Sequence, residues 1–92
     1  MGNQKITEIE RLIAQGHLDK AREDLQALLA KEHDNSSAWF LLGGIYRRME
    51  MWGEAINAYN KSKLLDPCGP AAAAVESIYD ILRFVNTDLM NP

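Results

Sequence analysis

The residues that could perform acid–base, metal or nucleophilic chemistry are few and widely separated in this sequence of 92 residues. His17 and His33 are the two histidines, and neither has cysteines or a carboxylate cluster at the spacing of metal ligands. Cys68 is the only cysteine, so no internal disulfide can form, and no activating base lies near it in sequence. We therefore expect no metal site and no cofactor, and we interpret Cys68 as a loop thiol in a reducing compartment.

The acidic and hydroxyl side chains also lack the partners that catalysis requires. Five carboxylates are closely spaced in two segments: Glu8, Glu10, Asp19, Glu23 and Asp24. We interpret them as solvated helix faces, and we interpret Ser36 and Ser37 as helix caps rather than nucleophiles. Gly43 and Gly44 lie inside a predicted helix, whereas a phosphate-binding loop lies between a strand and a helix. Since no residue set supplies a nucleophile with its base, we expect the protein not to be an enzyme.

Composition excludes several classes of partner. Apolar residues make up 47% and charged residues 25% of the chain, which is typical of a soluble globular protein. The net charge is −3 and no segment is strongly basic, so nucleic-acid binding is not expected. The apolar runs are too short to span a bilayer, and the start MGNQKITEIE does not resemble a signal peptide. We expect a cytoplasmic protein with no membrane partner.

The elements that must position any functional residue are helices. Apolar residues recur at helical spacing in five segments, residues 6–13, 18–29, 39–49, 52–65 and 70–86. No segment shows sustained alternation with a period of two, so the predicted fold class is all-α, without a sheet. The connections are short, which makes successive helices antiparallel neighbours.

The second and fourth segments match at a fixed offset, which places Ala21 on Ala55 and Leu25 on Tyr59 (55 − 21 = 34 and 59 − 25 = 34). A period of this length built from two helices predicts a helical-repeat architecture. In the second copy, small Gly43 and Ala55 would let the two helices of a pair approach closely, which offsets the cost of about 1 kcal/mol of a glycine within a helix. The large side chains expected in the core are Trp39, Leu42, Tyr46, Trp52 and Tyr59.

The second copy carries seven residues at the spacing of a known repeat: Trp39, Leu42, Gly43, Tyr46, Ala55, Tyr59 and Pro67. With this pattern, the chain resembles the tetratricopeptide repeat family. Tyr59 stands where the family more often has phenylalanine, and Ser62 stands where it prefers alanine. The resemblance implies two antiparallel helix-turn-helix pairs stacked as a short right-handed solenoid, with a fifth helix that closes the stack.

The resulting organisation is a single domain over residues 1–92. Residues 1–34 form a degenerate repeat, residues 35–68 a well-matched repeat, residues 70–86 the closing helix and residues 87–92 a tail. The first copy is more polar than the second, as a terminal repeat that meets water must be. The closing helix fits the pattern after a shift of two residues, which predicts a two-residue insertion before it and a packing face made of Val75, Ile78 and Leu82.

The resemblance also implies where a partner binds. In this family the first helix of each pair lines a concave groove that holds extended or helical peptides. The corresponding partner-binding residues lie beside the packing faces of the third and fifth helices: Phe40, Gly44, Arg47, Arg48, Asp80, Arg83 and Phe84. Two aromatic residues flanked by arginines match the composition of interaction hot spots. In the alternative interpretation, Phe40 and Phe84 pack on neighbouring helices and the arginines are merely solvated.

Some members of the family capture the C-terminal carboxylate of chaperones with lysine and asparagine side chains. The corresponding positions here are Ile6, Glu10 and Leu41, which donate no hydrogen bond to a carboxylate, so this partner class is disfavoured. We expect a non-enzymatic scaffold that binds a peptide or helix of another protein. The alternative is a self-associating, homodimeric assembly module with a seam at exposed Phe84 or Leu89.

Overall fold

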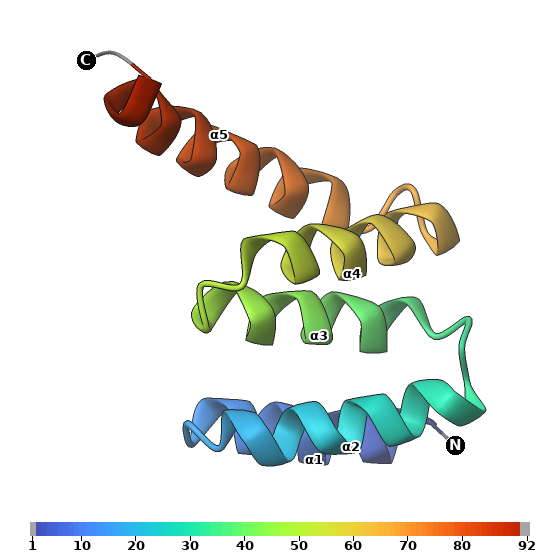
Figure 1. Ribbon diagram of the computed structural model, residues 1–92. Coiled ribbons are helices and arrows are strands. Elements are labelled where there is room, and N and C mark those ends of the chain that lie inside the picture. The colour runs from blue at the N-terminus through green and yellow to red at the C-terminus, as the bar shows by residue number, and fades with distance from the viewer. Residues whose placement is uncertain (1, 91–92) are drawn as a thin grey trace.

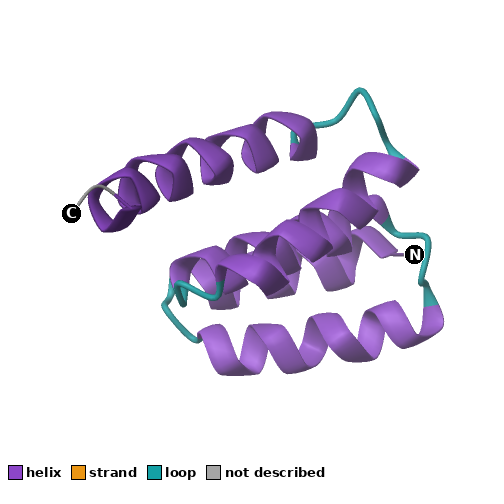
Figure 2. Ribbon diagram, turned by 45° about the horizontal axis from the view of Figure 1, so that its top comes forward, coloured by secondary structure: helices purple, strands orange, loops and turns teal. Residues whose placement is uncertain are grey.

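All the regular structure in the part of the chain that is described is helical. A computed structural model describes the backbone of residues 2–90 and the side chains of residues 4–84. Its elements are α1 (Gly2–Ala14), α2 (Leu18–Lys31), α3 (Ser36–Arg48), α4 (Trp52–Leu65) and α5 (Ala71–Met90). Short loops join these helices, and residues 2–90 contain no strand (Figure 2). The predicted all-α fold class is confirmed.

The helices form two stacked pairs and one closing helix (Figure 1). α1 packs on α2, α3 packs on α4, and contacts between α2 and α3 join the two pairs. α5 packs on α4 and then diverges, so that its C-terminal half lies away from α3 and α4 (Figure 1). The described chain is therefore elongated, with extents of 52 × 28 × 18 Å.

The repeat found in the sequence is visible in the backbone. α1 is followed by Gly16 with a φ of 83°, and α3 is followed at the repeat offset (50 − 16 = 34) by Glu50 with a φ of 59°. At the end of α3 the amide of Met51 donates to the carbonyl of Tyr46 at 2.8 Å, and the equivalent bond at the end of α1 measures 2.9 Å. This bonding pattern, with a left-handed residue inside it, satisfies the last carbonyls of a helix. The two turns are thus built alike.

The closing helix packs through the residues expected of it. Val75 and Ile78 are buried against α4, and Leu82 is half-buried beside them. α5 begins at Ala71 and α3 begins at Ser36, so their offset exceeds that of the repeat by one (71 − 36 = 35). By this measure the connection between α4 and α5 is one residue longer than the repeat requires, whereas the sequence predicted an insertion of two residues.

α5 is longer than predicted, because it continues to Met90 instead of ending at residue 86. The segment 87–90, interpreted as part of a tail, is helical. Thr87, Asp88, Leu89 and Met90 include no glycine or proline, so no breaker ends the helix before Pro92. The predicted seam at Leu89 lies outside the described side chains.

Two clusters of buried side chains hold the helices together. The first cluster, centred on Ile9, Leu25 and Leu42, joins α1, α2 and α3. The second cluster, which contains Ala55 and Tyr59, joins α4 to α5. Each large apolar side chain buried in this way stabilises the fold by roughly 1.5–3 kcal/mol. The core predicted at these positions is confirmed.

Gly43 provides the close approach predicted for it, with Tyr59 as the neighbour. A methyl group at position 43 would lie 2.6 Å from Cδ1 of Tyr59, and the Tyr59 ring is itself buried. Trp39 and Trp52, by contrast, were expected in the core and are only half-buried. Both pack at the edges of the clusters, where part of each indole meets solvent.

The start of α3 is capped by Asn35, whose side chain accepts from the amide of Ala38 at 3.0 Å. Ser36, which we interpreted as a cap, makes a different contact. Its hydroxyl lies 3.0 Å from that of Ser62, and the Ser62 hydroxyl donates to the Ser36 carbonyl at 2.9 Å. Because Ser62 is buried, these bonds satisfy a polar group that would otherwise be costly to enclose. They tie the start of α3 to the end of α4.

Candidate functional site

A first groove lies between α1, the N-terminal half of α3 and the connection from α4 to α5. It has a volume of about 190 Å³. We call it the α1–α3 groove, and its lining residues are Ile6, Glu10, Ser36, Ser37, Phe40, Leu41, Ser62, Asp66 and Pro70. Three of these, Ile6, Glu10 and Leu41, are the positions that correspond to the carboxylate-capturing residues of the resembled family. They do lie in one groove, and Glu10 would repel a carboxylate there.

Phe40 contributes to both the core and this groove. Its ring lies 5.4 Å from that of Tyr59 at an angle of 47°, so it packs on the second cluster and is half-buried. Tilted aromatic pairs of this kind stabilise by about 0.5–1.5 kcal/mol beyond the area they bury. The interpretation of Phe40 as a residue that packs on a neighbouring helix therefore holds in part, while its remaining surface lines the α1–α3 groove.

Gly44 and Arg47 lie farther along the same side of α3, next to Tyr59. A methyl group at position 44 would lie 3.6 Å from the Tyr59 hydroxyl, which is an ordinary contact. The Arg47 guanidinium donates to the Ser77 hydroxyl of α5 at 3.2 Å. Burial raises the pKa of the Tyr59 phenol above its ordinary value, and the nearby charge and hydrogen bond of Arg47 oppose part of that increase. Arg47 thus links α3 to α5 rather than pointing freely into solvent.

Arg48 makes a similar contact with the helix on the other side of α3. Its guanidinium donates to the carbonyl of Ile13, near the end of α1, at 3.2 Å. Consequently Arg47 connects α3 to α5, while Arg48 connects α3 to α1. Arg48 therefore helps to hold α1, one wall of the α1–α3 groove, on α3, and neither arginine is among the residues that line the groove.

The predicted residues on α5 are exposed and lie outside the groove. Asp80 and Arg83 form an ion pair at 3.6 Å, and both side chains are largely exposed. Phe84 is 73% exposed, so it does not pack in the way that the alternative interpretation proposed for it. All three belong to α5, whose C-terminal half diverges from α3 (Figure 1). Of the seven predicted partner-binding residues, Phe40 alone lines this groove.

A second and larger groove was not predicted. It lies between α2 and α4 over the side of α3 that carries Trp39 and Tyr46, and its volume is about 440 Å³. We call it the α2–α4 groove, lined by Gln26, Leu29, Ala30, Trp39, Leu42, Tyr46, Glu54, Asn57, Ala58 and Lys61. From the sequence, Trp39 and Tyr46 were expected to fill the core. The small residues Ala30 and Ala58 are the signal that could have shown an unfilled space above them.

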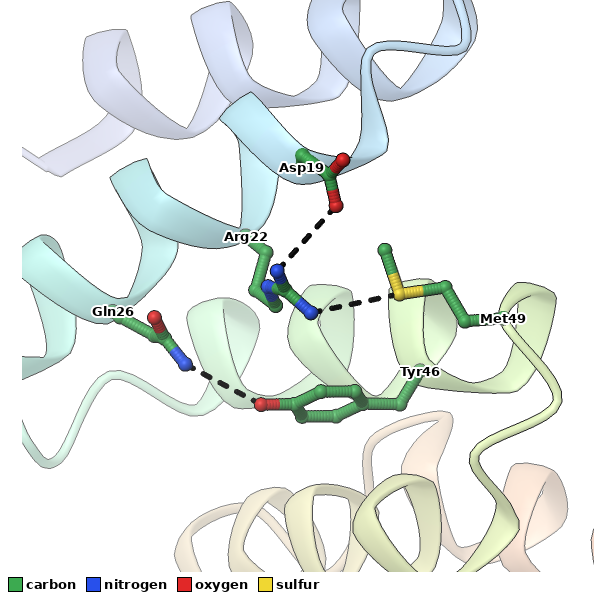
Figure 3. Close-up of polar contacts among 5 residues, drawn as sticks. All are labelled: Asp19, Arg22, Gln26, Tyr46 and Met49. Carbon is green, nitrogen blue, oxygen red and sulfur yellow. Dashed lines mark hydrogen bonds and ion pairs between the residues drawn. The ribbon is translucent and has the colours of Figure 1, made fainter.

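Polar contacts between α2 and α3 border one end of the α2–α4 groove (Figure 3). The Gln26 side chain donates to the Tyr46 hydroxyl at 3.4 Å, and the Arg22 guanidinium lies 3.9 Å from the sulfur of Met49. Arg22 also pairs with Asp19 at 3.4 Å. At the other end, the Trp39 indole donates to the carbonyl of His33 at 2.8 Å. These bonds hold the two aromatic side chains of the groove in place.

Metal-ligand clusters and membrane-spanning helices are absent from the described residues. Within them, no group of three or more histidine, cysteine, aspartate or glutamate side chains could hold a metal ion. None of the helices in this part of the chain is long and apolar enough to cross a membrane. Cys68 is exposed with a free thiol.

The fold and the two grooves define a class of protein, a helical-repeat domain built from stacked helix pairs. No family model and no curated protein matches the chain. Among solved structures, the solution NMR structure of the Bacteroides fragilis protein BF1650 is similar, with a TM-score of 0.83 and 34% sequence identity. The match covers 99% of this chain and 91% of BF1650. The chain belongs to the same family as BF1650.

Proposed function

We propose that this protein is a non-enzymatic interaction module of the tetratricopeptide type, which binds an extended segment of another protein in the α1–α3 groove. One observation carries the proposal, namely a groove with an apolar floor formed by Phe40 and Leu41 beside two exposed carboxylates. The residue pattern at Trp39 to Pro67 supports it as well. The exposed thiol of Cys68 fits a reducing, cytoplasmic location.

The charges of the groove favour a basic ligand. Glu10 of α1 and Asp66 at the end of α4 both line it, and its lining residues include no lysine or arginine. Neither carboxylate has an ion-pair or hydrogen-bond partner among the described side chains. An arginine or lysine of the ligand would meet both acids, while an adjacent apolar side chain covers Phe40. We therefore propose a segment in which a basic residue lies next to a bulky apolar one.

The two parts of such a ligand would contribute differently. An exposed ion pair is worth about 0–1 kcal/mol, so Glu10 and Asp66 mainly select the ligand and speed its association. The apolar residue seated on Phe40 supplies more of the affinity, about 1–2 kcal/mol or more if it is an anchor. Arg47 and Arg48 keep α5 and α1 in position on either side of α3.

The test is selection from a phage-displayed random peptide library, followed by fluorescence anisotropy on the enriched peptides. We expect enriched sequences to pair a basic with an apolar residue, and Glu10→Lys to weaken binding several-fold without lowering the melting temperature. Leu64→Asp, on exposed α4 outside this groove, is the matched control and should bind like the parent. If no peptide is enriched, or if enriched peptides bind Glu10→Lys as tightly as the parent, the proposal is wrong.

A further inference from the structure

The α2–α4 groove continues into a second hollow at the C-terminal end of α4. This hollow has a volume of about 240 Å³, and it shares Trp39 and Lys61 with the groove. The Lys61 ammonium lies 5.2 Å from the centre of the Trp39 ring, so its side chain crosses the boundary between the two spaces. Next to the hollow, Leu64 is 81% exposed. An exposed leucine beside an apolar groove is a feature of surfaces that associate.

The exposed side of α4 has a symmetric arrangement of side chains. Met51, the residue before α4, and Leu64, in its last turn, are exposed apolar residues, and acidic Glu54 and basic Lys61 lie between them in sequence. Glu54 and Lys61 line opposite ends of the same groove. In an antiparallel pair of α4 helices with a two-fold axis level with Asn57 and Ala58, Glu54 of one copy lies level with Lys61 of the other, because both are equally far from the axis along the helix. Glu54 and Lys61 also lie on nearly the same face of α4, because two helical turns separate them.

We propose that two copies of this chain associate through their α4 helices, packed antiparallel about that axis. In this arrangement Glu54 lies opposite Lys61 of the second copy, and both ion pairs form at once. Leu64 of each copy lies level with the end of the other copy's groove that Tyr46 lines. A two-fold contact uses the same patch twice, so the patch must complement itself, and the charge order along α4 does so.

The groove provides the room and the apolar surface for this contact. Ala30 and Ala58 are small, so a second α4 can approach the groove closely. Burial of Leu64 is the main driving force, because exposed ion pairs contribute little and mainly fix the register. This contact leaves the α1–α3 groove of each copy open, so peptide binding and self-association can be tested separately.

The experiment is sedimentation equilibrium of the intact chain from about 10 µM to about 1 mM, a range that detects even weak association. We expect the parent to shift from monomer to dimer. Leu64→Asp should remain monomeric and keep the parental melting temperature. Phe84→Asp is the matched control, an exposed apolar residue on α5, and should dimerise like the parent.

The register is tested by charge reversal. Glu54→Lys and Lys61→Glu should each weaken the dimer, because like charges then face each other, and the double variant should recover most of the parental association. A parent that stays monomeric at about 1 mM overturns the proposal. Dissociation by Phe84→Asp with no effect of Leu64→Asp overturns it in favour of a seam on α5. A double variant as weak as the single ones overturns the antiparallel register.

Discussion

The two helix pairs have nearly the same backbone and fill it with different side chains. At the contact inside the first pair, Ile9 and Leu25 are both almost completely buried. At the equivalent positions of the second pair, Gly43 faces the ring of Tyr59. At this position α4 thus carries a larger residue than α2 does, while α3 carries no side chain. The comparison shows that the contact can be filled from both helices or from the second helix alone.

The pairs also differ at two further equivalent positions. The turn inside the first pair has Gly16 at its left-handed position, and the turn inside the second pair has Glu50. Near the end of the second helix, Leu28 in the first pair corresponds to the buried, hydrogen-bonded Ser62 in the second. The second pair therefore carries the stronger family resemblance and also the less usual residues. Each difference can be tested by exchanging residues between the pairs.

The largest loss of stability is expected from Gly43→Ala. The added methyl group would lie 2.6 Å from Cδ1 of Tyr59, and a buried ring cannot move aside cheaply. We expect a loss of about 1–3 kcal/mol by overpacking, despite a gain of up to about 1 kcal/mol in helix propensity. Denaturant unfolding of dilute protein measures it. Gly44→Ala is the control, since its methyl group meets only the Tyr59 hydroxyl at 3.6 Å, and it should be neutral or slightly stabilising.

A smaller residue at position 59 should then relieve the overpacking caused by Gly43→Ala. Tyr59→Leu introduces the residue of the first pair, and in the Gly43→Ala background it should cost less than it does alone. The double-mutant cycle should give a favourable coupling of about 0.5–3 kcal/mol, as for residues in direct contact. Additive effects of the two changes would show that the residues at positions 43 and 59 do not compensate for each other.

An intermediate loss of stability is expected from Ser62→Ala. The change removes the donor to the Ser36 carbonyl, a bond of 2.9 Å, and leaves that carbonyl without its side-chain partner. We expect a loss of about 1 kcal/mol. Thermal unfolding should show a decrease of about 4–8 °C for a domain of this size. Ser37→Ala is the control, because Ser37 follows Ser36 in the sequence and its side chain is exposed. This variant should melt like the parent.

Much of the fold could be predicted from residue types and spacing, and the exceptions have physical reasons. Gly43 was informative because a glycine within a helix needs a compensating contact. The α2–α4 groove was missed because a pattern of apolar residues marks Trp39 as packed without showing that α2 opposes it with Ala30. The end of α5 was placed too early because the segment after residue 86 lacks apolar periodicity, yet nothing in it breaks a helix.

The candidate site was harder to predict than the fold. Sequence spacing could place Phe40, Arg47 and Arg48 along α3. It could not show that long arginine side chains would reach across to Ser77 and Ile13. Nor could it show that Asp66, far from Glu10 in sequence, would line the same groove. Such contacts depend on how three helices meet, which local patterns do not contain.

The smallest effect on stability, and an expected gain, comes from the turn of the second pair. Glu50 adopts a φ of 59°, which costs a side-chain-bearing residue roughly 1–2 kcal/mol and costs glycine almost nothing. Glycine also has more freedom to lose on folding, by about 0.4–1 kcal/mol, so Glu50→Gly should raise the free energy of unfolding by only about 0.5–1 kcal/mol.

Two further variants test whether the left-handed backbone conformation causes the gain in stability of Glu50→Gly. Glu50→Ala keeps the left-handed conformation on a residue with a side chain, so it should melt like the parent. Gly16→Ala should lose about 1 kcal/mol, although a methyl group there meets no atom within 4 Å and no clash can explain the loss. If Glu50→Ala gains as much as Glu50→Gly, the benefit comes from removing the carboxylate. The two turns would then be alike in shape but not in strain.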